Sequence, residues 1–147
     1  MGAVDYLTQS GTDLKTLLET DTELSGYAAT PYTETDELVR IRKKYPEISI
    51  ELHTIGSGEF TTGSPEKILE YRIRTYTEYL DETSSKTQNN NIAGRIIEIL
   101  DNTSNWDFTN GCYRIDTDVN FEYETAISNK DKISRSSEIT AKIYLQE

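Results

Sequence analysis

The residues with the clearest potential for chemistry form an acidic run late in the chain. From Asp116 to Glu124 an oxygen-bearing side chain occupies every second position, namely Asp116, Asp118, Asn120, Glu122 and Glu124. The opening Asp-x-Asp-x-Asn spacing is that of a calcium-binding EF-hand loop. The rest of that loop is missing, because position six is Phe121 instead of glycine and position twelve is Ile127 instead of glutamate. The sequence therefore does not predict an EF-hand here.

The same alternation predicts a β-strand on which the five oxygen-bearing residues share one face. Three interpretations of this acidic stripe remain open. It is a solvated strand face with ion pairs to Arg72, Arg74 or Lys142, or a negatively charged wall that lines a channel. The third is a metal-dependent hydrolytic site built on Asp116 and Asp118, which would lack a histidine, a lysine or a ligand from a second element.

No other pattern in the sequence indicates catalysis or cofactor binding. The chain has one histidine, His53, and one cysteine, Cys112, which excludes the usual zinc sites and any disulfide within the chain. The Gly56-Ser57-Gly58 cluster lacks the GK[ST] ending of a phosphate-binding loop. We therefore predict no catalytic residues, no metal and no cofactor, and a protein that is not an enzyme.

The charge of the chain favours some classes of partner and disfavours others. The formal net charge is −11, which disfavours a protein that grips nucleic-acid phosphates but is compatible with one that encloses nucleic acid without binding it. Four of the fifteen basic residues gather in one short segment, Arg40, Arg42, Lys43 and Lys44. This basic patch is either a solvated strand end or a docking surface for an acidic partner. No apolar run is long enough to span a membrane.

Two helices are predicted from apolar spacing. The more strongly patterned one covers residues 89–100, where isoleucines and a leucine recur at helical spacing and one of the three asparagines at its start can act as the cap. The other covers residues 4–25, with a possible break at Gly11 and a stop at Gly26.

Four amphipathic strands complete the pattern. Alternating apolar residues predict strands over 47–53, 68–80, 113–127 and 136–145. The polar tracts 27–37, 54–67 and 81–90 read as loops or linkers. The resulting fold class is α+β, a single domain over residues 1–147, with an antiparallel sheet of about four main strands and two helices on one face. The element order is α-β-β-α-β-β.

This order of elements resembles the tail terminator, or tail-completion, proteins of long-tailed phages and related archaeal viruses. The resemblance spans nearly the whole chain and rests on its helices and on the strand sequences around them. The segments that carry it are Thr12–Asp21, the loop with Tyr27, Tyr45–Leu52, Tyr71–Arg74, Asn91–Leu100 and the closing strand pair.

The resemblance implies a structural virion protein at the junction of tail and neck, assembled in the host cytoplasm. It would form a homohexameric ring that caps the tail tube, contacts the tube protein and a neck or connector protein, and surrounds the channel through which DNA passes without specific binding. We expect the acidic stripe to line that channel. The alternatives are a head-completion or neck adaptor protein and, from another class, a small metal-dependent hydrolase using Asp116 and Asp118. A monomeric binding module is the remaining possibility.

Overall fold

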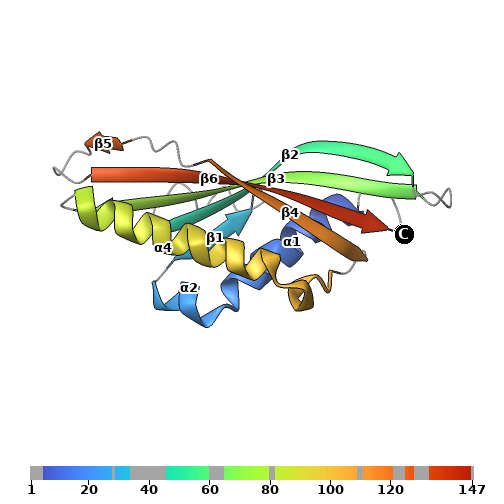
Figure 1. Ribbon diagram of the computed structural model, residues 1–147, viewed down its shortest axis with the longest axis horizontal. Helices are drawn as coiled ribbons and strands as arrows, with labels where there is room; N and C mark the ends of the chain where they lie inside the picture. The colour runs from blue at the N-terminus through green and yellow to red at the C-terminus, as the bar shows by residue number, and fades with distance from the viewer. Residues whose placement is uncertain are drawn as a thin grey trace.

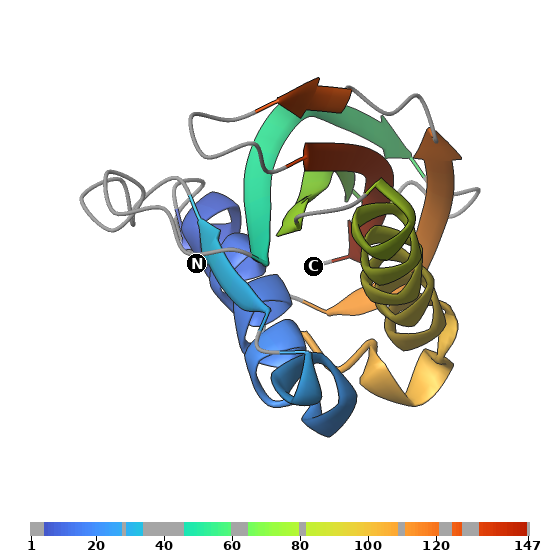
Figure 2. The same cartoon turned by 90° about the vertical axis from the view of Figure 1, so that its left-hand side faces the viewer.

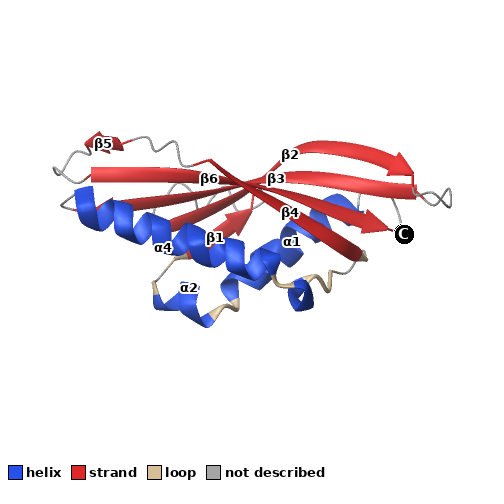
Figure 3. Ribbon diagram, viewed as in Figure 1, coloured by secondary structure: helices blue, strands red, loops and turns tan. Residues whose placement is uncertain are grey.

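The computed structural model describes residues 5–27, 29–33, 46–59, 65–79, 82–108, 111–120, 125–127 and 133–146. A layer of helices lies beneath one long twisted sheet (Figures 1 and 3). The helices are α1 (Asp5–Glu19), α2 (Thr22–Gly26), α4 (Glu82–Asp101) and the 3-10 turn η2 (Thr103–Asn105). The strands are β1 (Thr30–Thr33), β2 (Glu47–Glu59), β3 (Pro65–Tyr79), β4 (Cys112–Asn120), β5 (Thr125–Ile127) and β6 (Ile133–Gln146).

The strands form one sheet in the order β1-β2-β3-β6-β4, and β5 pairs with the first residues of β6. The pairings β2–β3, β3–β6 and β4–β6 are all antiparallel, whereas the short β1 runs parallel to β2. The predicted α+β class with four main antiparallel strands is therefore confirmed. The two additions are the short strands β1 and β5.

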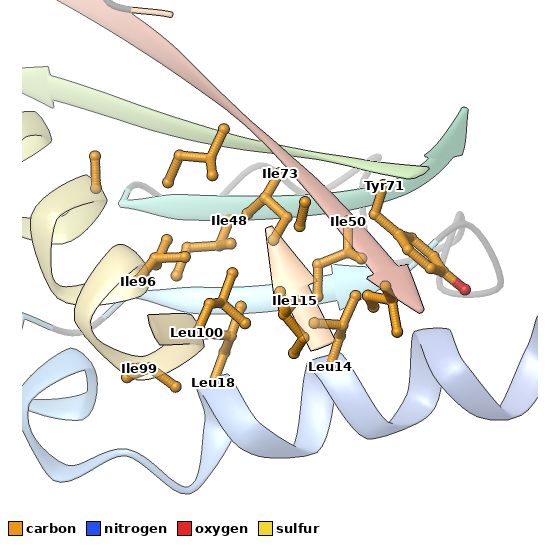
Figure 4. Close-up of a cluster of buried hydrophobic side chains, with 14 of the residues drawn as sticks. Leu14, Leu18, Ile48, Ile50, Tyr71, Ile73, Ile96, Ile99, Leu100 and Ile115 are labelled. Carbon is orange, nitrogen blue, oxygen red and sulfur yellow. The ribbon is translucent and has the colours of Figure 1, made fainter. Parts of the chain in front are cut away.

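Both long helices pack on the same face of the sheet, which Figure 2 shows curving over them. The alternation of apolar residues along the strands explains this arrangement, because every second side chain of a strand must enter the core. The predicted stripe of α4 faces the sheet through Ile92, Ile96, Ile99 and Leu100, all buried. Leu14 and Leu18 of α1 join the same core, and Figure 4 shows both sets of side chains beneath the isoleucines of the sheet.

The prediction of a polar linker over residues 81–90 was wrong, because α4 begins at Glu82. Its first turns show no apolar spacing, because Ser84, Lys86 and Thr87 are exposed. Asn89 is the one buried residue among the side chains of this stretch that the structure describes. Asn89 is consequently an interior helix residue that contacts the sheet, and it is not the cap. Within the described residues, no helix is both long and apolar enough to cross a membrane.

Several other helix and strand boundaries also differ from those predicted. β2 continues to Glu59 and β3 begins at Pro65, so most of the predicted loop 54–67 is strand. β1 lies within the predicted loop 27–37, and the predicted strand 113–127 is divided into β4 and β5. The predicted helix 4–25 is two helices. Gly11 does not break α1, and it is buried where an added Cβ would lie 3.6 Å from the Tyr71 hydroxyl.

Arg95 of α4 binds two carboxylates at the start of α2 and so joins the two helices. Its Nη2 donates to Asp21 Oδ1 at 2.7 Å and its Nε donates to Asp21 Oδ2 at 3.1 Å, while Glu23 Oε2 lies 3.0 Å from the same Nε. Asp21 also caps α2 by accepting the backbone N–H of Leu24 at 3.0 Å. The hydrogen bonds from Arg95 hold the pKa of the Asp21 carboxyl below its ordinary value.

We expect Arg95→Met to lower the urea midpoint at about pH 7 and to have much less effect at about pH 3. A carboxyl whose pKa is lowered by folding stabilises the protein above its unfolded pKa, and this contribution is lost as the pH falls through the folded-state pKa. Arg95→Lys keeps the charge but lacks the planar fork, so its urea midpoint at about pH 7 should lie between those of the wild type and Arg95→Met. An equal loss for Arg95→Met at both pH values would contradict the assignment to Asp21.

Candidate functional site

The face of the sheet that points away from the helices carries the polar side chains of β2, β3, β6 and β4. Asp116 and Asp118 of β4 lie on this open face, because they line one groove with Arg72 of β3 and Lys142 of β6. Their neighbour Ile115 is buried in the core on the opposite face. The predicted two-faced strand is therefore confirmed for the described part of the acidic stripe.

The centre of the open face is an ion-pair network between strands. Arg74 Nε donates to Glu138 Oε2 at 3.1 Å, and its Nη1 lies 3.6 Å from Glu51 Oε2. Arg72 reaches the same glutamate, with its Nε 3.7 Å from Glu138 Oε1. The hydrogen bond to Glu138 raises the pKa of the Arg74 guanidinium. Arg72 and Arg74, two of the predicted partners of the acidic stripe, are thus paired with other carboxylates.

Asp116 has cations close to it on the open face. Arg114 Nε donates to Asp116 Oδ1 at 2.9 Å, and Lys142 is the cross-strand partner of Asp116 in the register of β4 and β6. Asp118, by contrast, lies opposite Thr140. A groove of about 410 Å³ runs between these residues and is also lined by Glu70 and Tyr144. The described part of the face is therefore mixed in sign, with basic side chains set among the acidic ones.

An aromatic cluster at the start of β4 completes the open face. The register of β4 and β6 shifts between Cys112 and Arg114, which leaves Tyr113 as an extra residue on β4. Arg114 lies over the ring of Tyr144, 5.2 Å from its centroid, and the rings of Tyr113 and Tyr144 are 6.0 Å apart. Tyr113 is 37% exposed, and it is the one large apolar side chain that is exposed among the described residues. This cluster was not predicted from the sequence, because the extra residue at Tyr113 is defined by the register of β4 against β6.

The remaining predicted site residues are only partly placed. Asn120 ends β4, while Glu122 and Glu124 lie outside the described residues, as does the whole basic patch of Arg40, Arg42, Lys43 and Lys44. The structure therefore brings together two members of the acidic stripe, Asp116 and Asp118.

The described residues offer little for metal or thiol chemistry. They contain no group of three histidine, cysteine or carboxylate side chains arranged to hold a metal ion. Burial raises the pKa of the Cys112 thiol to about 11, and its sulfur lies 3.5 Å from the backbone oxygen of Arg114. A thiol with so high a pKa is protonated at neutral pH and is a poor nucleophile.

Comparison of the sequence with protein-family models and with curated proteins finds no match. Comparison with solved structures does find a likeness. The chain resembles one from the virion of a native gene transfer agent (GTA) particle, with a TM-score of 0.59 and 11% sequence identity. The alignment covers 100% of both chains. At this identity the likeness shows a shared fold, and it extends over the full length of each chain.

Proposed function

We propose that this protein is a structural component of a phage-like virion and that it caps the tail tube as a homohexameric ring at the tail-to-neck junction. The observation that carries the proposal is the full-length likeness to a chain of the GTA virion. A match that leaves no part of either chain unaligned supports a shared whole-subunit role better than a match limited to a common sheet.

The open face of the sheet is the surface that we place against the channel. Asp116, Asp118 and Glu70 are interleaved there with Arg72 and Lys142, on a subunit whose net charge is −11. Binding to DNA requires an extended basic track that displaces counterions from the phosphates. A wall of mixed sign offers no such track, so DNA would pass along it without being held.

The tail tube protein and a neck or connector protein are the proposed partners along the ring axis. The basic patch of Arg40, Arg42, Lys43 and Lys44 is proposed as a docking surface for an acidic partner, because opposite charges on two partners steer their encounter and set their orientation. A head-completion or neck adaptor protein is the alternative within the same class.

The hydrolase built on Asp116 and Asp118 is less well supported. Arg114 donates to the Asp116 carboxylate, and Lys142 lies opposite Asp116 in the register of β4 and β6. Both cations would compete with a metal ion for that carboxylate. A divalent-dependent activity that is lost in Asp118→Asn would favour this alternative over the structural role.

The mass of the assembly tests the proposed ring. Native mass spectrometry of the full chain should give a species of six times the 16.8 kDa subunit, and negative-stain micrographs should show rings with a central opening. A chain that stays monomeric at micromolar concentration, with and without divalent ions, would contradict the proposal and favour a monomeric binding module.

A further inference from the structure

The sheet has two open edges, one on each side. β1 pairs with β2 only over Glu47–Ile50, the first four of its 13 residues, so nine residues of β2 have no neighbour on that side among the described residues. On the opposite side β4, also nine residues long, pairs only with β6 in the described part of the chain. An unpaired edge presents free N–H and C=O groups and is a template for pairing with another chain.

The two edges are matched in direction. β2 and β6 run one way and β3 and β4 the other, because each adjacent pair of these strands is antiparallel. A rotation about an axis along the strands keeps their directions. Such a rotation would bring the β4 edge of one copy beside the β2 edge of the next as an antiparallel pair, which continues the pattern of the sheet.

The two edges also lie at the same level along the strands. The registers connect one row of residues across the sheet, Asp118, Thr140, Arg72 and Glu51. A second row near the other end of β4 consists of Arg114, Tyr144, Ile68 and Gly56. The open parts of the two edge strands therefore overlap in level along the strand direction.

The residues along the two edges are complementary in size. The β4 edge carries Tyr113 at the bulge and the neighbouring Arg114, both of them exposed. Tyrosine and arginine are enriched where protein surfaces bind tightly. The β2 edge carries Gly56 in the row of Arg114, and Gly58 lies two residues further along the strand. Glycine within a strand often marks a place where another backbone approaches closely, and aromatic residues pack well over glycine on a neighbouring strand.

We propose that neighbouring copies of this chain bind each other by pairing β4 of one with the Glu51–Glu59 part of β2 of the next, with Tyr113 packed over the glycines of β2. The inference rests on the proposed ring and names the surface that builds it. The contact is head-to-tail, because each copy uses a different edge on its two sides. Contacts of this kind generate rings when the rotation closes.

Disulfide cross-linking tests the pairing directly. In a Cys112→Ser background, we would introduce one of two pairs of substitutions, Asp118→Cys with Glu51→Cys or Asp116→Cys with Thr54→Cys. Each pair joins residues of one row, and adjacent antiparallel strands hold opposite Cα atoms about 4.5–5.5 Å apart, within the range of a disulfide. The matched control combines Asp118→Cys with Thr87→Cys, an exposed position on α4 in the helix layer. Mild oxidation of the full chain is followed by non-reducing gel electrophoresis and native mass spectrometry.

We expect at least one edge pair to give a covalent ladder of up to six chains, and the control to stay largely monomeric on the denaturing gel. If the native protein forms rings but neither edge pair cross-links above the control, the β4–β2 pairing is wrong and the ring proposal survives. If the edge pairs cross-link into open chains of varied length, the pairing stands and the closed hexamer is wrong. A native monomer in which no pair cross-links contradicts both.

Discussion

Replacing Asn89 by aspartate should destabilise the protein at about pH 7 by at least ~3 kcal/mol, since uncompensated burial of a charge costs several kcal/mol. Asn89 is fully buried between α4 and the sheet. Its Nδ2 donates to the backbone oxygen of Thr75 at 3.0 Å and to Thr77 Oγ1 at 3.3 Å. The substitution keeps the shape of the side chain but places an anionic oxygen against the carbonyl of Thr75.

The effect of Asn89→Asp should depend strongly on pH. Burial favours the neutral form, so the new carboxyl group has a folded-state pKa above its unfolded value. Relative to the wild type, the variant is therefore least stable above the folded-state pKa, and the deficit shrinks as the pH falls toward the unfolded pKa. Below that range the protonated group can donate to Thr75. Urea unfolding from about pH 4 to pH 8 measures the deficit.

The neighbouring substitution Asn90→Asp is the matched control, because Asn90 is exposed on the same turn of α4. It should change stability by less than about 0.5 kcal/mol, as surface substitutions usually do. A deficit for Asn89→Asp that stays constant across the pH range would mean that the new carboxylate reaches water, and that the first turns of α4 do not hold to the sheet.

The parts of the fold that sequence reasoning predicted are those in which a short window determines the outcome. β6 alternates without interruption, and its inward residues Ile139, Ala141, Ile143 and Leu145 are all buried as that alternation requires. The same holds for the helical stripe ending at Leu100. In both cases the period of the apolar residues and the buried face agree, so no information from elsewhere in the chain was needed.

The first half of α4 and the strand β1 were missed because contacts distant in sequence determine them. Residues 82–88 lack apolar spacing, and the turn that follows is fixed by the hydrogen bonds of Asn89 to β3. β1 is four residues long and is defined by its parallel pairing with Glu47–Ile50. A strand so short, containing Pro31, has no pattern of its own that distinguishes it from a loop.

In the candidate site, too, some features follow from a short stretch of sequence and others from contacts with distant strands. Alternation correctly placed Asp116 and Asp118 on one face, but the charge of that face depends on which residues stand opposite. The register places Lys142 beside Asp116, and the bulge at Tyr113 turns Arg114 toward Asp116 and Tyr144. Neither register nor bulge can be read from one strand alone. A stripe that is acidic in sequence is thus part of a surface of mixed sign in the fold.

The second large effect is expected from Ile96→Ala, which should lower the free energy of unfolding by about 2–5 kcal/mol. Ile96 is fully buried, and Figure 4 shows it pointing from α4 toward the sheet beside Ile48. The substitution removes apolar surface from the core and leaves a cavity, because neighbours on a rigid sheet relax only in part.

The adjacent Ile97→Ala is the matched control, since Ile97 has the same chemistry on the same helix but is only half-buried. It should cost about 1 kcal/mol, because less apolar surface is lost and water can fill the space. Urea unfolding followed by far-UV circular dichroism, at one fixed protein concentration to hold any assembly constant, gives both values with an unchanged m-value. Equal losses at the two positions would mean that α4 is rotated about its axis relative to the sheet. The placement of Asn89 against Thr75 would then also be wrong, because Asn89, Ile96 and Ile97 all lie on the one rigid helix α4.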